Sequence, residues 1–387
     1  MPRNVLLREM AGKLRARLTP QVITLRPNGE SKGNLLLSYL QQPFMARGRR
    51  SEHLHSNQWE CHEIADVWNR FGYTVDVISW DNRRFRPAKK YDFFIDIHGN
   101  MERIAPLLSR DCIKILHITG SHWLFQNLAE FERLLALQRR KGATLLPRRL
   151  AEPSMGIEYA DCAVLIGNDA TRSTFDYASK PIYEIDVTAV QEFPYPESKD
   201  FGRCRKNYLW FGSDGLVLKG LDIVLETFAA MPDYRLYVCG PVAREKDFEA
   251  LYYDELYRTP NITTAGWVDV RGQGFRDIAD DCLGVVFPSA SEGQSGSVVQ
   301  CLHAGLIPVI SRPTGIDAGG FGVMLRELTV EEVRSAISNL SGAPEESLRS
   351  LSRKSWEYAR ARHTRERFTA RYTEIVSDLL RTREARS

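Results

Sequence analysis

The feature that most constrains the fold is an alternation of apolar strands and helices that runs along the chain in two series. In the first series the strand segments are apolar throughout rather than at every second residue, which is typical of parallel strands buried on both faces. Helices fill the gaps between them, and this arrangement predicts a parallel sheet covered on both sides. The predicted strands are 34–40, 74–80, 93–98, 113–119, 163–166 and 182–187, and the predicted helices are 56–71, 100–109 and 123–140.

The pattern stops at a polar segment with two prolines, residues 192–200, and then starts again. Such a segment is the best candidate for a domain boundary. We therefore predict two doubly wound α/β domains, residues 1–198 and 199–363, with ligands in the cleft between the carboxyl ends of their strands. The second series has strands at 208–211, 235–239, 262–265, 283–287 and 307–311, and helices at 221–230, 297–304, 331–340, 345–361 and 364–380.

Composition excludes several classes of protein. The chain has 387 residues, 43% of them hydrophobic and 26% charged, which is ordinary for a soluble protein with enough core for two domains. No apolar run reaches the ~18 residues that span a membrane, and the N-terminal residues lack a signal-peptide pattern, so we expect a cytoplasmic location. The seven cysteines include no C-x-x-C pair, which predicts buried thiols rather than zinc ligands or disulfides.

The net charge of +3 hides an asymmetry between the two halves. Residues 1–150 hold 25 Lys and Arg against 14 Asp and Glu, a net charge of +11, so the rest of the chain carries −8. A basic half indicates either an anionic partner, such as a membrane surface, or a solvated charged face. The basic groups do not alternate with aromatic residues, which argues against a nucleic-acid partner. They cluster at 3–17, 47–50, 139–141 and 148–149.

The first twenty residues add to this picture. Leu7, Met10, Leu14 and Leu18 fall at helical spacing among basic residues, which predicts a short amphipathic helix. Such a helix either lies on a membrane interface or packs on its own domain.

The stretch 287–300 has the clearest chemical pattern. An apolar strand ends at Phe287, a loop of small residues follows with one carboxylate, Glu292, and the loop opens a helix. Free backbone N–H groups and the positive end of a helix attract an anion, and a carboxylate beside them accepts hydrogen bonds from hydroxyl groups. A phosphorylated sugar has both kinds of group.

A second loop supports the same chemistry. The strand that begins the second series ends at Gly212, and after a short loop Lys219 and Gly220 start a helix. The loop can bring N–H groups close to a phosphate, and Lys219 adds a positive charge.

These two segments together resemble the donor-sugar signature of retaining GT-B glycosyltransferases of the family 4 type, over roughly residues 205–345. The resemblance implies an α/β GT-B fold with two Rossmann-like domains facing a cleft. Residues 1–198 would be the acceptor-side domain, 199–363 would bind a nucleotide-diphosphate sugar, and the helix at 364–387 would pack back on the first domain.

The resemblance also assigns roles to residues of the second domain. Glu292 would contact hydroxyls of the donor sugar, and Lys219 would bind the pyrophosphate. The other implied donor contacts are Gly212, Ser213, Gly240, Trp267, Val268, Gln294, Ser295, Gly296, Ser297 and Gln300.

Two of these positions depart from the family pattern. Ser213 stands where the family has an Arg, and Gln300 stands where it has a second Glu, and a neutral group binds its partner less strongly than a charged one. We therefore expect lowered donor affinity or a changed donor, with activity retained. The alternative is a non-catalytic GT-B partner subunit or glycan-binding protein. A GT-B epimerase would need cleft carboxylates from both domains, and the first offers only Asp96.

In the first domain, His117 ends a predicted strand and matches a family histidine that faces the transferred sugar. With Glu292 it makes the predicted catalytic pair, although a lone histidine on an apolar strand is more often a core residue. His98 and Asn57 are predicted on the acceptor side. The resemblance implies retaining transfer to a glycan or lipid-linked acceptor in polysaccharide or glycoconjugate biosynthesis. No metal or other cofactor is expected, and the location would be cytoplasmic or peripheral on the inner face of the membrane.

Overall fold

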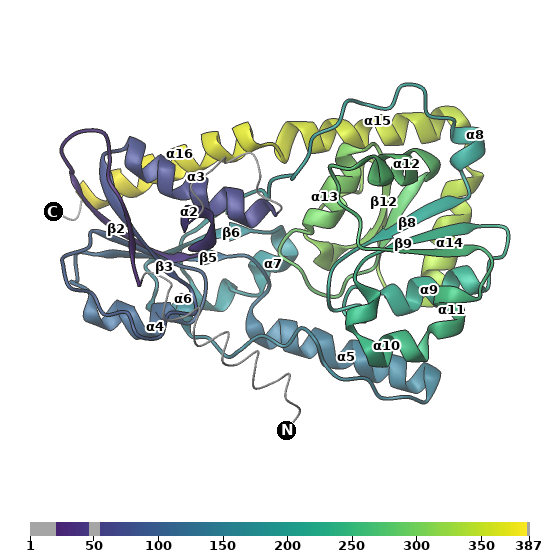
Figure 1. The fold of residues 1–387 in the computed structure, drawn as a ribbon, viewed down its shortest axis with the longest axis horizontal. Coiled ribbons are helices and arrows are strands. Elements are labelled where there is room, and N and C mark those ends of the chain that lie inside the picture. Colours follow the sequence, from purple (N-terminus) through teal and green to yellow (C-terminus); the bar gives the residue numbers. More distant parts are fainter. Residues whose placement is uncertain (1–20, 46–54, 385–387) are drawn as a thin grey trace.

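The structure, a computed structural model, describes residues 21–45 and 55–384, and it consists of two α/β lobes side by side along its long axis (Figure 1). The first lobe has a seven-stranded sheet in the order β1-β3-β2-β4-β5-β6-β7, and the second a six-stranded sheet in the order β10-β9-β8-β11-β12-β13. All neighbouring strands are parallel except β1 and β3. The predicted helix around 7–18 and the basic cluster at 47–50 lie outside the described residues.

The strands have the following bounds: β1 Ile23–Leu25, β2 Gly33–Tyr39, β3 Tyr73–Ser79, β4 Phe93–Asp96, β5 Ile113–Ile118, β6 Cys162–Ile166 and β7 Ile182–Ile185 in the first lobe, and β8 Asn207–Phe211, β9 Arg235–Cys239, β10 Ile262–Gly266, β11 Gly284–Phe287, β12 Ile307–Ser311 and β13 Val323–Leu325 in the second.

The helices are α2 Gln42–Met45, α3 Ser56–Arg70, α4 Asn100–Ile104, α5 Trp123–Lys141, α6 Gly156–Tyr159, α7 Asp169–Ser173, α8 Phe201–Cys204, α9 Leu221–Ala229, α10 Lys246–Leu251, α11 Tyr253–Tyr257, α12 Gln273–Asp281, α13 Gly296–His303, α14 Val330–Gly342, α15 Glu345–Arg362 and α16 Arg365–Glu384.

Both sheets are buried on both faces, as the apolar strands predict. Leu35, Leu36 and Leu37 are consecutive in β2, and all three are completely buried, although their side chains point to alternate faces. One face of the first sheet packs under α3 and α16, and the other under α4 and α6. In the second lobe α9 and α14 cover one face, and α12, α13 and α15 cover the other (Figure 1).

The last two helices join the lobes from above. Helix α15 lies along the second lobe, and α16 crosses back to pack on α3 and β7 (Figure 1). Phe368 meets Trp59 edge to face at 5.8 Å, and Arg383 pairs with Asp92 near the end of α16. The predicted return of the last helix to the first domain is therefore confirmed, while the exact boundary at 198/199 stays a prediction.

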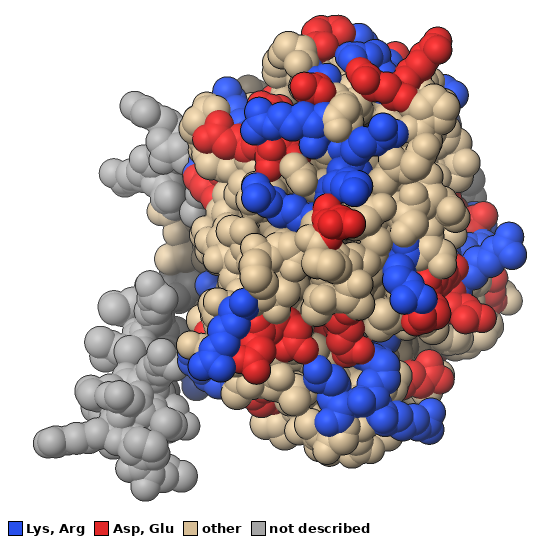
Figure 2. Space-filling model, turned by 90° about the vertical axis from the view of Figure 1, so that its right-hand side faces the viewer, with Lys and Arg blue, Asp and Glu red and all other residues tan. Residues whose placement is uncertain are grey.

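Helix α5 joins the lobes from below (Figure 1). Arg133 of α5 and Asp222 of α9 form a buried ion pair at 2.7 Å, and Arg140 contacts Asp222 and Glu226. Lys141 pairs with Glu255 of α11 at 2.9 Å. Part of the positive excess of the first half thus neutralises the acidic second lobe. Both signs of charge lie next to each other over the end of the second lobe (Figure 2).

Candidate functional site

The two lobes meet where the carboxyl ends of their strands face each other. Gly293, in the loop between β11 and α13, lies so close to the first lobe that a Cβ atom would sit 2.5 Å from the Thr119 carbonyl and 2.6 Å from that of Ile166. Ser121 and Thr171 donate hydroxyl hydrogen bonds to the carbonyl of Glu292 at 3.4 and 3.3 Å. The first lobe therefore fixes the backbone of the Glu292 loop.

Lys219 and Glu292 are 73 positions apart in sequence and form an ion pair at this junction. The Lys219 residue is 5% exposed and the Glu292 side chain 13% exposed. Ser289 donates a hydrogen bond to the same carboxylate at 3.2 Å. A ligand with phosphate and hydroxyl groups would compete for both members of the pair, because the ammonium binds phosphate oxygens and the carboxylate accepts from hydroxyls.

Helix α13 begins beside this pair, and its first turn is open. Ser295 is the N-cap and accepts from the N–H of Val298 at 3.5 Å. Apart from the backbone of α13 and the chain neighbours of Gly296, no atom of the described residues lies within 4 Å of the place where its Cβ would be, and Ser297 is half-buried. The Gln294 amide instead ties the lobes together, accepting from the N–H of Val187 at 2.7 Å and donating to Asp186 at 2.8 Å.

The glycine-containing loop after β8 has a different structure from the one expected for a phosphate loop. The backbones approach closely, since a Cβ on Gly240 would lie 2.7 Å from the carbonyl of Gly212. The N–H groups of Gly215 and Leu216 donate to the buried carboxylate of Glu245 at 2.5 and 3.3 Å. Burial raises the pKa of Glu245, and hydrogen bonds from those N–H groups oppose that shift. The protein's own carboxylate thus occupies N–H groups of the loop that we expected to approach a phosphate.

The Arg149 side chain packs over this loop from the first lobe. The sequence analysis assigned Arg149 no role. A Cβ on Gly215 would collide with the Arg149 side chain, while Ser213 is exposed. Arg149 is an exposed residue and forms no ion pair with the residues that the structure describes. The only signal in the sequence was its place in the basic cluster 148–149.

Gln300 lies in α13 and is 2% exposed. Its amide oxygen accepts from the N–H of Gln191 at 3.0 Å, and its amide nitrogen donates to the carbonyl of the same residue at 2.6 Å. Gln300 therefore holds α13 to the segment between the lobes, and its predicted donor contact would compete with this interaction.

Trp267 follows β10 with 66% of its surface exposed, and Val268 packs partly against the core.

A cavity of about 470 Å³ opens in the first lobe at the ends of β4 and β5. His117 is fully buried at its wall, and neither ring nitrogen has a hydrogen-bond partner among the described residues. Burial lowers the pKa of His117 to about 4, so the ring is neutral at pH 7. Buried polar atoms without partners are rare in proteins, so these nitrogens mark a point where a ligand could bind. The wall also includes His98, Ser121, His122, Arg148, Arg149 and Glu152.

The two residues predicted on the acceptor side are separated. His98 lines this cavity and stacks on Trp80 with 5.6 Å between ring centroids. Asn57 lies in the first turn of α3, where its N–H donates to the Nδ1 of His55 at 3.4 Å, and it is not part of the cavity wall. No group of three or more His, Cys, Asp or Glu side chains among residues 21–45 and 55–384 is placed to hold a metal ion.

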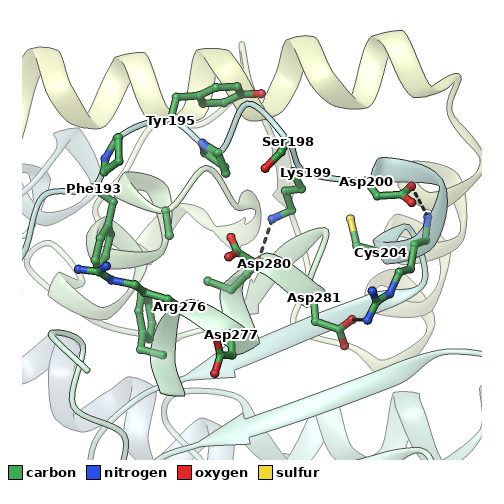
Figure 3. A pocket seen from close by; sticks show the side chains of 16 residues that line it. Phe193, Tyr195, Ser198, Lys199, Asp200, Cys204, Arg276, Asp277, Asp280 and Asp281 are labelled. Carbon is green, nitrogen blue, oxygen red and sulfur yellow. Dashed lines mark hydrogen bonds and ion pairs between the residues drawn. The ribbon is translucent and has the colours of Figure 1, made fainter. Parts of the chain in front are cut away.

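A second cavity, of about 520 Å³, lies away from this junction, between the segment 193–200 and α12 (Figure 3). It includes none of the predicted site residues. Lys199 points into the lobe there and donates to the carbonyl of Ala279 at 2.8 Å (Figure 3). It is 6% exposed, and burial lowers its pKa. Lys199 is therefore a lysine as buried as Lys219 but outside the junction between the lobes.

Solved structures of other proteins share the fold of this chain. The chain is similar to sucrose-phosphate synthase from Thermosynechococcus elongatus, with a TM-score of 0.62 and 13% identity over 90% of this chain and 99% of that one. It is also similar to HepE of Anabaena in complex with UDP and glucose, with a TM-score of 0.55 and 12% identity over 90% and 99%.

TarM of S. aureus, solved in a complex that includes UDP, matches with a TM-score of 0.52 and 13% identity over 73% of this chain. The match spans only 54% of TarM. Neither protein-family models nor curated proteins give a match to the sequence. The structural similarities define the fold of this chain, which is the GT-B fold.

Proposed function

We propose that this protein is a glycosyltransferase that moves a sugar from a nucleotide-diphosphate sugar to a glycan or lipid-linked acceptor. The observation that carries the proposal is the Lys219–Glu292 ion pair, which lies in the second lobe where it meets the first, beside the open first turn of α13. A cation, free N–H groups and a carboxylate in one place suit a ligand that combines phosphates with sugar hydroxyls. Proteins of the same fold have been solved with UDP, which supports a nucleotide donor.

Each residue then has a role in the reaction. Lys219 and the N–H groups of α13 stabilise the negative charge of the departing nucleotide diphosphate. Glu292 orients the sugar by accepting from its hydroxyls. The neutral His117 forms a hydrogen bond with the sugar or the acceptor in the first-lobe cavity, and Arg149 supplies a cation where Ser213 cannot. We propose that the anomeric configuration is retained, that the leaving phosphate accepts the proton of the acceptor, and that no metal takes part.

The same proposal includes a biological setting. The acceptor would belong to polysaccharide or glycoconjugate biosynthesis. The protein would act in the cytoplasm, on its own or on the inner face of a membrane.

Thermal unfolding with UDP, GDP, ADP and their common sugars tests the donor site. A nucleotide present at about 100 times its dissociation constant should stabilise the fold by ~2.7 kcal/mol. We expect a shift with one nucleotide, lost in Lys219→Met and reduced in Glu292→Gln. Lys199→Met is the matched control, because Lys199 is buried to the same degree in the other cavity and should leave the shift unchanged.

A second candidate function, a non-catalytic partner subunit or glycan binder, has its own support. The Gln300 amide and the Gly215 and Leu216 N–H groups all have partners within the protein, and Ser213 adds no charge. A folded sample that shifts with none of the nucleotides would favour this function over transfer.

A further inference from the structure

The second cavity, between the segment 193–200 and α12, has no part in the proposed function (Figure 3). Its volume of about 520 Å³ lies within the range of small-molecule sites, roughly 300–1,000 Å³. The segment is held over the cavity from above, because the Tyr195 hydroxyl donates to the carbonyl of Arg349 in α15 at 3.3 Å. The cavity therefore lies between the chain that connects the two lobes and the interior of the second lobe.

Lys199 is the unusual residue of this cavity. Three basic residues of the described structure are buried, and the other two, Arg133 and Lys219, each form an ion pair with a carboxylate. Lys199 is 6% exposed, forms no ion pair with a described residue, and donates to the carbonyl of Ala279 at 2.8 Å. A buried charge in a protein is normally paired, so the partner that suits Lys199 is an anion.

Capping of α12 is the simplest alternative role for Lys199, because Ala279 lies in the last turn of that helix. The Ala279 carbonyl, however, also accepts from the N–H of Cys282 at 3.3 Å, so the helix end has a backbone partner without the lysine. The carbonyl uses one of the three donors of the ammonium. Burial lowers the pKa of Lys199, because one neutral partner does not compensate for the loss of hydration.

The other buried side chains of the cavity wall are aromatic or small. The rings of Phe193 and Phe275 stack with 5.9 Å between their centroids and 22° between their planes. Tyr195 and Ala304 line the same cavity and are each 8% exposed. Aromatic rings around a single ammonium suit a ligand that has an apolar or flat body and one anionic group.

The charges of the wall distinguish between kinds of anion. Besides Lys199 the wall includes two exposed arginines and four aspartates, namely Asp200, Asp277, Asp280 and Asp281. Carboxylates thus outnumber cations by four to three. A phosphate ester with about two negative charges would be repelled by these carboxylates, whereas a single carboxylate needs only the one buried cation.

We propose that this cavity is a binding site for a small monocarboxylate with an apolar or aromatic body, and that the carboxylate pairs with Lys199. The ligand would also contact the chain that connects the lobes, because Phe193 and Tyr195 belong to it. The cavity does not include Lys219 or Glu292, so the ligand would be a different one from the nucleotide donor and its sugar.

Asp280 is the competing partner for Lys199 within the protein. Asp280 follows Ala279 on α12, and Figure 3 shows its carboxylate on the same side of the cavity as the lysine amine. Asp280 is exposed and does not form an ion pair with Lys199 in the structure. Burial lowers the pKa of Lys199 more than the charge of Asp280 raises it, so Asp280 compensates the buried ammonium only in part.

Calorimetric titration of the full-length protein tests the site with benzoate, phenylacetate and hexanoate, each beside its neutral amide. At least one of the three acids should bind, and its amide should bind at least about tenfold more weakly, because the amide cannot form the charge-assisted bond. Phenyl phosphate should also bind more weakly than that acid. Detergent is left out, because it would compete for an apolar cavity, and none of the described helices is long and apolar enough to cross a membrane.

Two variants locate the binding. Lys199→Met removes the ammonium but keeps most of the side-chain volume, and its affinity for the acid should fall at least about tenfold. The matched control is Lys219→Met, which removes an equally buried ammonium at the junction and should bind the acid as the wild type does. The comparison of acid with amide uses the wild type alone, so it decides the question even if Lys199→Met fails to fold.

Three results would contradict the site. The first is that none of the acids binds the wild type more tightly than its amide does, and the second is binding of an acid that a folded Lys199→Met protein keeps. The third is binding that appears in Asp280→Asn but not in the wild type, which would mean that Asp280 itself is the anion for Lys199.

Discussion

At the scale of single residues, His117 is the clearest case of a side chain whose burial does not stabilise the fold. A histidine with an ordinary pKa of 6.5 is fully buried, and burial lowers its pKa to about 4. Between those two pH values the unfolded chain binds a proton that the folded protein does not, so the histidine makes the protein less stable as the pH falls. Glu60 and Asp96 act in the opposite direction, since burial raises the pKa of each carboxyl to about 7.

Replacing His117 with Gln isolates its contribution, because both proteins keep Glu60 and Asp96. We expect the wild type to lose about 2 kcal/mol more unfolding free energy than His117→Gln between pH 8 and pH 5. Urea unfolding at a series of pH values measures this difference. Parallel curves for the two proteins would show that the ring is accessible to protons in the folded state.

Gly293 is constrained in a different way, by close backbone contact between the two lobes. A Cβ at this position would meet two carbonyl oxygens of the first lobe at 2.5 and 2.6 Å, so Gly293→Ala must shift the lobes or the loop. We expect a loss of about 1–3 kcal/mol, as in other overpacked sites. Gly296→Ala is the control three residues away, where the Cβ would meet nothing within 4 Å and a helix start gains propensity. Equal unfolding temperatures for the two variants would contradict the close contact.

At the scale of elements, α5 is attached to the second lobe through charge. Asp222 is fully buried and has two arginine partners, Arg133 and Arg140. Removing one partner leaves a buried carboxylate partly uncompensated, so Arg133→Leu should cost about 3 kcal/mol of unfolding free energy. Arg139→Leu, on the same helix but exposed and without an ion pair in the described part of the chain, should change it by less than about 0.5 kcal/mol. Denaturant unfolding of the three proteins checks this, and equal losses would mean that helix propensity rather than the buried pair is responsible.

The elements also show how far the sequence could lead. The predicted long strands and helices are confirmed to within a few residues, because their apolar runs are long enough to stand out. Strand β1 has only three residues and pairs with β3 about fifty positions later, and α10 and α11 are too short to show a period, so none of them was predicted. The extent of α5 was predicted, but its position under the second lobe depends on contacts with residues 80 or more positions away.

The candidate site likewise has features that the sequence could predict and features that it could not. Lys219 and Glu292 were predicted as site residues, because each lies in a strand–loop–helix segment with a clear local pattern, but their ion pair across 73 positions was not. The partners of Gln300 and Gln294 were not, since they come from the segment that links the lobes, more than 100 positions away. The same holds for Glu245, which binds the loop after β8 from thirty positions away. Long-range contacts of this kind leave no periodicity in the sequence.

At the scale of the whole molecule, the relation between the lobes decides whether His117 and Glu292 can act on one ligand. Besides the returning last helix, the Gln300 contact and the buried Arg133–Asp222 pair, two sets of contacts maintain it. One is the junction around Gly293 and Gln294, and the other is the row of ion pairs from Arg140, Lys141 and Arg148 to the second lobe. The pairs with Glu226, Glu255 and Asp247 are partly exposed, so each alone contributes about 0–1 kcal/mol, but they act together on a single helix and the segment after it. Arg140 also contacts the buried Asp222, which keeps Arg133 as a partner when Arg140 is replaced.

The variant Arg140→Gln/Lys141→Gln/Arg148→Gln should therefore loosen the lobes without unfolding either one. We expect a larger radius of gyration in small-angle X-ray scattering and faster amide exchange in α9 and α10, while the unfolding temperature falls by only a few degrees. The control variant, Arg258→Gln/Arg334→Gln/Arg349→Gln, removes three ion pairs within the second lobe and should scatter as the wild type does. Identical scattering from all three proteins would mean that the remaining contacts, namely α16, Gln300, the buried Arg133–Asp222 pair and the junction around Gly293, keep the lobes together, and that these three ion pairs have no part in their arrangement.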